Sequence, residues 1–261
     1  MYGTNYGSVK VLEESLEPSV ASFFRFALAS LVFIPNVIKV FGSNPKVITS
    51  GFQVGLFNAG GYFAQAMALN TGAEVSNAAF ICSMSVIVVP LLNLLPSPGN
   101  LKTRASFSQM YPPMLALMGI ACLELGGTSG AMGTGDMVAF LCPLMFGYAV
   151  CLYSSLTHTH THTVCLHFSL NIHMPIQYWK NAALVKNCQG PEEILAFAGS
   201  AIASVALMSS LWVGVDVIYP AWAYGGIDRV TEICSSQIIH LSDLPVISAI
   251  AWTGVYTSYL L

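Results

Sequence analysis

The chain has 261 residues, of which 55% are hydrophobic and only 8% are charged, and its formal net charge is −3. A soluble domain carries about 25% charged residues, so this chain has too few charges to cover a globular surface in water. An all-α integral membrane bundle fits instead, because lipid requires each backbone polar group to be paired inside the protein. The small net charge and the lack of a basic run exclude a nucleic-acid partner from the expectations.

The cysteines indicate neither a disulfide framework nor a metal site. There are seven, scattered without a CxxC pair, and we interpret them as small buried hydrophobic residues. No phosphate-binding loop or Ser/His/Asp grouping is recognisable, so neither an enzyme nor a cofactor is expected. Met1–Val11 lacks the basic region followed by an apolar core that is typical of a signal peptide.

The chain begins with a short polar helix and a long apolar one. Met1–Glu17 is interpreted as the end of a helix, which Pro18 terminates while opening the next. Ser19–Ile38 is long enough to cross a hydrocarbon core of about 30 Å. Arg25 lies about 10 Å along this helix from Pro18. At that depth the guanidinium can reach the interface, so we predict an interfacial anchor in preference to a substrate-binding residue.

The next two apolar segments form a hairpin. They are Ile48–Asn70 and Ser76–Leu95, joined by Thr71–Val75. Pro90 is expected to kink the second segment. Earlier in that segment, Phe80 and Ser83 share one face, which is expected to meet the first segment of the hairpin.

The first segment of the hairpin has two distinct faces. Asn58, Tyr62 and Gln65 recur at i, i+4 and i+7 and make a polar stripe along one side of a helix. Another face carries only small residues, which let a neighbouring helix approach closely: Gly60, Ala64 and Ala68. A membrane helix with such a pair of faces is predicted to line a cavity.

The second half of the chain continues the pattern of apolar segments. The predicted spans are Phe107–Gly126, Met137–Leu156, Ile194–Val215 and Pro245–Leu261. Asp216–Leu244 contains Pro220, Gly225-Gly226 and five charges, so it is interpreted as a mixed loop whose aromatic residues lie at the membrane interface.

Thr157–Thr163 alternates threonine and histidine, and three interpretations compete. On a strand, the three histidines would share one face and could bind a metal. A disordered polar tract is the second interpretation. The third, which we favour, is an in-frame CA-dinucleotide repeat, so that residues 149–173 would be an unspliced intron or a gene-model insertion. Spliced RNA reads that contain the repeat would contradict it.

The distribution of positive charge predicts the topology. If the chain crosses at each span, loops 39–47, 96–106 and 157–193 share a side and carry six Lys or Arg residues, against Lys10 and Arg229 on the other. The positive-inside rule places the richer side in the cytosol, or in the stroma or matrix of an organelle. Both the plasma membrane and an organellar membrane such as a plastid membrane remain open.

Several motifs recur in an order and spacing known from one transporter family. They are Tyr2–Tyr6 with Lys10, Pro18 with Phe24–Ala29, Pro35, Gly55–Tyr62 with Gln65, Asn77–Ile81, Val88–Leu91, Gly135-Asp136, Phe146-Gly147 and Trp252–Gly254. The chain resembles an EamA-type member of the drug/metabolite transporter superfamily. The resemblance extends over residues 1–148 and, less closely, over residues 194–261.

This resemblance implies two inverted five-helix repeats around a central cavity with alternating access. Residues 1–126 would be the first repeat, with a partial first helix. Residues 127–261 would be the second, interrupted at about 149–173 and lacking its last helices, so that about seven or eight spans are expected. The implied function is a multi-pass permease for a small organic metabolite. The alternative is a nonfunctional or regulatory fragment of such a transporter from an incomplete gene model.

The expected partners are a small-molecule solute and the lipid bilayer, with a homodimer as one option. The candidate substrate-binding residues are Asn58, Tyr62, Gln65, Phe80, Ser83, Tyr6, Tyr148, Trp252 and Tyr256. Each of these side chains could instead make an interhelical hydrogen bond or an aromatic contact. No carboxylate is expected deep in a span, so the sequence does not predict proton coupling.

Overall fold

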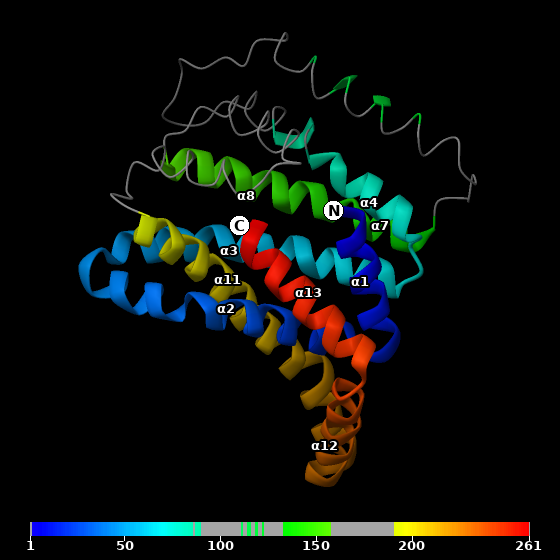
Figure 1. The fold of residues 1–261 in the computed structure, drawn as a ribbon. Helices are drawn as coiled ribbons and strands as arrows, with labels where there is room; N and C mark the ends of the chain where they lie inside the picture. Colours follow the sequence, from blue (N-terminus) through cyan, green and yellow to red (C-terminus); the bar gives the residue numbers. More distant parts are fainter. Residues whose placement is uncertain are drawn as a thin grey trace.

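A computed structural model describes residues 2–85, 87–89, 111, 114–115, 118–119, 122, 133–157 and 191–260 (Figure 1). All of the regular elements in these ranges are helices, as predicted. They are α1 (Tyr2–Ser15), α2 (Pro18–Ser43), α3 (Pro45–Asn70), α4 (Val75–Ser83), α7 (Thr134–Ala139), α8 (Leu141–Thr157), α11 (Pro191–Val213), the π-helical turn η3 (Gly214–Ile218), α12 (Tyr219–Leu241) and α13 (Leu244–Leu260).

Several of these helices are suited to a membrane. Among the described residues, three helices are long and apolar enough to cross one: Pro18–Ser43, Thr134–Leu152 and Glu192–Ala221. A fourth crossing results if Gly226–Leu241 and Leu244–Gly254, which are bent by 82°, count as one broken span. The predicted span Phe107–Gly126 and most of the segment 149–173 lie outside the described residues.

Local sequence signals set the start of α2 and the end of α3 where they were predicted, whereas α2 continues beyond the predicted Ile38 and α3 begins before the predicted Ile48. Pro18 occupies the first turn of α2, where its missing N–H is not needed. α3 ends at Asn70, and Gly72 follows with a φ of 95°. The Ala73 N–H donates to the Ala68 carbonyl at 2.9 Å and the Gly72 N–H to the Leu69 carbonyl at 3.2 Å. This is a Schellman motif, in which glycine takes the left-handed position.

α3 is the central helix of the bundle. It packs against α11 and α2 on one side and against α7 and α8 on the other (Figure 1). α11 approaches so closely that a methyl group on Gly51 or Gly55 would overlap the Phe197 or Ala201 carbonyl oxygen, respectively. The lack of a side chain at these glycines therefore sets the distance between α3 and α11.

The predicted small-residue face of α3 meets α7 and α8. Ala64 and Ala68 pack in one buried cluster with Ala139 and Cys142. A methyl group on Gly135 would lie 2.7 Å from the Ala68 carbonyl oxygen, so α7 also approaches the α3 backbone closely. Both sides of α3 are thus held by small residues.

The predicted loop Asp216–Leu244 is wrong. This stretch is helical, and α12 projects away from the other helices (Figure 1). Gly226, with a φ of 68°, is the only break in α12. Beyond it, residues 227–241 contain neither glycine nor proline, so the charges on this segment occupy the surface of an exposed helix.

Two other predicted segments are divided. Met137–Leu156 consists of α7 and α8, with a turn at Phe140. In the second segment of the hairpin, α4 ends at Ser83 and a turn at Met84 precedes the helical residues 87–89. Pro90 and the predicted continuation to Leu95 lie outside the described residues.

We expect Gly55→Ala to destabilise the bundle by about 2 kcal/mol, because the added methyl group forces α3 away from the α11 backbone. The measurement is thermal unfolding of the full chain in detergent. Gly42→Ala is the matched control, since no atom lies within 4 Å of the methyl group that it adds. Equal unfolding midpoints for the two variants would contradict the close approach.

Candidate functional site

The predicted polar stripe of α3 lies inside the bundle. Asn58 is 8% exposed and Gln65 is 4% exposed, while Tyr62 is half-buried. The Tyr62 ring lies between two other helices, with its centroid 4.6 Å from that of Phe26 in α2 and 5.0 Å from that of Phe146 in α8. The stripe therefore faces neighbouring helices, and its role as a cavity lining stays a prediction.

Arg25 lies in the same interior, while its predicted place at the membrane interface stays a prediction. The residue is only 3% exposed, and its guanidinium carbon lies 5.3 Å from the centroid of the Phe26 ring. Helices α1, α3, α11 and α13 all contact α2. A methyl group on Gly254 of α13 would lie 3.2 Å from the Arg25 carbonyl oxygen. These helices enclose the side chain.

A carboxylate accompanies this buried cation. Arg25 interacts electrostatically with Glu13 of α1 and with Tyr62 of α3. Both carboxylate oxygens of Glu13 are shielded from solvent, and neither has a hydrogen-bond partner in the described part of the chain. The prediction concerned carboxylates deep in a span, and α1 is not among the described helices that are long and apolar enough to cross a membrane, so it stays a prediction. Glu13 is partly buried because α1 packs against α2, α3, α4 and α13.

Several nitrogen donors in this interior are unpaired. Nε and Nη2 of Arg25 and Nε2 of Gln65 are buried without a hydrogen-bond partner among the described residues. A buried donor without a partner costs about 1–3 kcal/mol, and more when it is charged. Such donors favour the binding of a group that carries oxygen acceptors.

The other predicted residues lie in different surroundings. Tyr6 is 1% exposed and belongs to the buried cluster of α1, α3, α4 and α7. The Ser83 hydroxyl donates to the Phe80 carbonyl at 2.6 Å, a bond within α4. Tyr148 and Trp252 are 46% and 49% exposed. The side chain of Tyr256 lies outside the described residues. The structure thus brings only part of the predicted set together.

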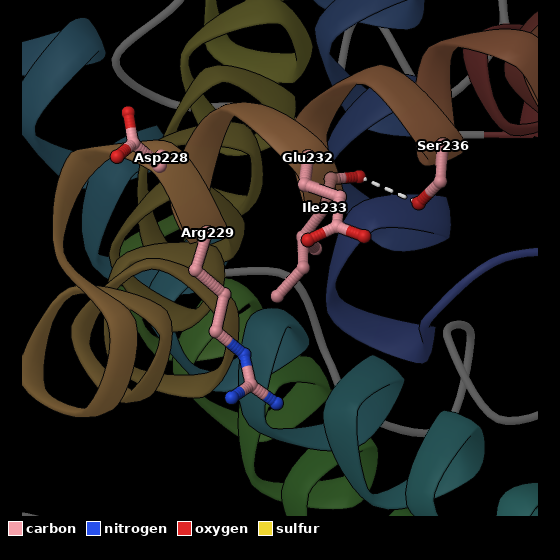
Figure 2. Close-up of a pocket in the computed structure, with 5 residues that line it drawn as sticks. All are labelled: Asp228, Arg229, Glu232, Ile233 and Ser236. Atoms are coloured by element: carbon pink, nitrogen blue, oxygen red, sulfur yellow. Dashed lines mark hydrogen bonds between the residues drawn. The ribbon is translucent and has the colours of Figure 1, made fainter.

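The hollows that the structure shows at its surface lie elsewhere. A pocket of about 510 Å³ runs along α12 and is lined by Asp228, Arg229, Glu232, Ile233 and Ser236 (Figure 2). All of these residues come from one helix, and the Ser236 hydroxyl already donates to the Ile233 carbonyl at 2.8 Å. A neighbouring pocket of about 490 Å³ is formed by Glu17, η3 and α12. Neither touches the predicted residues, and one exposed helix cannot enclose a solute.

We therefore take the interior group as the candidate site. It consists of Arg25, Asn58, Tyr62 and Gln65, with the carboxyl group of Glu13 close enough to interact with Arg25. Sequence reasoning missed Arg25 and Glu13. A signal for Arg25 was present, because a single charge in a long apolar helix usually faces the interior of a bundle.

No protein-family model matches the chain. An uncharacterized transporter from Archaeoglobus fulgidus is 29% identical over 154 residues, which are 59% of this chain and 46% of that protein. The chain thus spans about half the length of this relative. A solved structure titled only as a crystal structure of a protein covers 98% of this chain and 94% of its own, with 16% identity and a TM-score of 0.43.

Tyr62→Ala should lower the stability by about 3 kcal/mol, because it removes a ring that contacts both α2 and α8. Tyr148→Ala is the matched control. Its ring is half-exposed and stacks on Phe57 at 4.4 Å, so we expect a loss of about 1 kcal/mol. Chemical unfolding of the two variants in detergent checks the difference, and a larger loss for Tyr148→Ala would contradict this packing.

Proposed function

We propose that the chain is a multi-pass membrane permease that moves a small organic metabolite by alternating access. The observation that carries the proposal is the interior polar group of Arg25, Asn58, Tyr62 and Gln65. It lies in a bundle that contains helices long and apolar enough to cross a membrane. Polar and ionisable groups inside such bundles are costly, and they usually belong to a path for solutes or ions.

The relative from Archaeoglobus fulgidus supports a transport role in general, because its name is that of a transporter and it matches 59% of this chain. The finer assignment is to the EamA-type transporters, with residues 1–126 and 127–261 as two inverted repeats. In such a fold the substrate site lies near the middle of the membrane, between the repeats. The proposed site, on α2 and α3, belongs to the first repeat.

The position of α3 supports a lining role for its polar stripe. α3 is 26 residues long, yet it is not among the described helices that are apolar enough to cross a membrane alone. Its neighbours α2, α7, α8 and α11 contact it and bury its polar stripe. A helix protected in this way can carry amide and hydroxyl groups toward a solute, since few of its polar atoms meet lipid.

Flux through reconstituted protein tests the proposal. Proteoliposomes are loaded with a mixture of small organic metabolites, and mass spectrometry measures what leaves compared with protein-free vesicles. We expect Gln65→Leu to reduce the flux about tenfold, equivalent to about 1.4 kcal/mol, while membrane insertion stays normal.

Gln53→Leu is the matched control, because Gln53 lies on the same helix but is exposed. Its flux should equal that of the wild type. Equal flux for both leucine variants would mean that the polar stripe of α3 contributes to helix packing and does not line a path for the solute. A lack of any protein-dependent flux in the wild type would overturn the permease.

A further inference from the structure

We propose that Arg25 is an anion-binding residue, and that the solute carries a carboxylate which binds the edge of the guanidinium formed by Nε and Nη2. The transport part of this inference rests on the proposed permease function. The binding part concerns only the chemistry of the buried group and can be measured without transport.

The surroundings of Arg25 make its charge available to a ligand. The residue is 3% exposed, so its guanidinium has lost most of its water. The Phe26 ring, 5.3 Å away, offers its face to the cation but no hydrogen-bond acceptor in the plane of the guanidinium. A buried cation needs an acceptor as well as an aromatic neighbour.

The identity of the unpaired atoms points to a carboxylate. Nε and Nη2 lie on one edge of the planar guanidinium, and both lack a partner among the described residues. Two parallel N–H groups on that edge match the two oxygens of a carboxylate in a bidentate pair. A single carbonyl or hydroxyl could accept from one of these groups but would leave the other unpaired and the charge uncompensated.

Glu13 acts on Arg25 from a distance without occupying this edge. The two residues attract each other electrostatically, yet both carboxylate oxygens of Glu13 are also without hydrogen-bond partners. When it is ionised, Glu13 therefore moderates the positive charge of Arg25. An incoming carboxylate would compete with Glu13 for the electrostatic interaction with Arg25.

The local charges favour an anionic ligand. Burial raises the pKa of Glu13 to about 8, so this carboxyl group is mostly neutral at pH 7 and compensates little of the positive charge of Arg25. An added carboxylate would compensate that charge in surroundings shielded from water. Gln65 Nε2 offers a further unpaired donor on α3 for a neutral part of the solute.

Acetate and acetamide are the probes for the binding test, because they have nearly the same shape and differ in charge. Thermal unfolding of the full chain in detergent is followed with sodium acetate, acetamide, or sodium chloride at matched ionic strength. We expect acetate alone to raise the unfolding midpoint of the wild type. Arg25→Gln should abolish the shift. Arg25→Lys, which keeps the charge but loses the bidentate edge, should weaken acetate binding about tenfold.

Two further variants make the test specific. Arg229→Gln removes an exposed arginine of α12 and should leave the acetate effect unchanged. Glu13→Gln removes a carboxyl group that burial keeps mostly neutral below about pH 8, so at pH 9, where the wild-type group is ionised, the variant should bind acetate about threefold to tenfold more tightly. Circular dichroism verifies that each variant is folded. If Arg25→Gln does not fold, the test rests on Arg25→Lys and Glu13→Gln. Acetate binding that is unchanged in both of these variants overturns the proposal.

The remaining outcomes separate this inference from the permease. No acetate-specific shift in the wild type, or an undiminished shift in folded Arg25→Gln, overturns the anion site. Protein-dependent flux of neutral solutes only, equal in the wild type and Arg25→Gln, overturns the anion site and leaves the permease. Arg25-dependent acetate binding without flux of any solute supports the anion site and overturns the permease.

Discussion

The close approach of α3 to its neighbours is the constraint on which the rest of the bundle depends. On one side, Gly51 and Gly55 lie against the α11 backbone. On the other side, Ala64 and Ala68 meet α7 and α8. Small residues allow this contact because van der Waals packing between helices, and not the hydrophobic effect, holds membrane helices together. α3 can then carry the polar stripe on its remaining face, since the neighbouring helices shield the stripe from lipid.

This arrangement is destabilising where it buries polar atoms without hydrogen-bond partners. Arg25, Gln65 and Glu13 all have atoms without partners in the described part of the chain. The contact of Arg25 with the Phe26 ring contributes about 2 kcal/mol when desolvated, which offsets only part of the penalty for an unpaired charge. A protein that needed only stability would replace these residues by apolar ones at little cost. Their presence therefore favours a role in binding.

The sequence predicted well what depends on local signals. Pro18 opens α2, and the turn after Asn70 is a Schellman motif at Gly72, because proline and glycine restrict the backbone without help from distant residues. The burial of Arg25 was not predicted although a signal for it was present, because local signals do not show which neighbouring helices enclose a side chain. The same limit applies to Tyr148 and Trp252, whose half-exposed positions follow from how whole helices pack.

The proposed anion site also gives α1 and α13 a place in the mechanism. Leu12 and Leu16 of α1 pack with Val246 and Ile250 of α13 and with Ala21 of α2, so these helices hold Glu13 near Arg25. A solute can drive a conformational change only through a difference in its affinity for the two states. A carboxylate on Arg25 would weaken the attraction between α1 and α2 at this point, because it replaces Glu13 as the partner of the cation. In the proposed permease, the weaker attraction between α1 and α2 would make the affinity for an anionic solute differ between the two states. The solute would thereby favour one orientation of the bundle over the other.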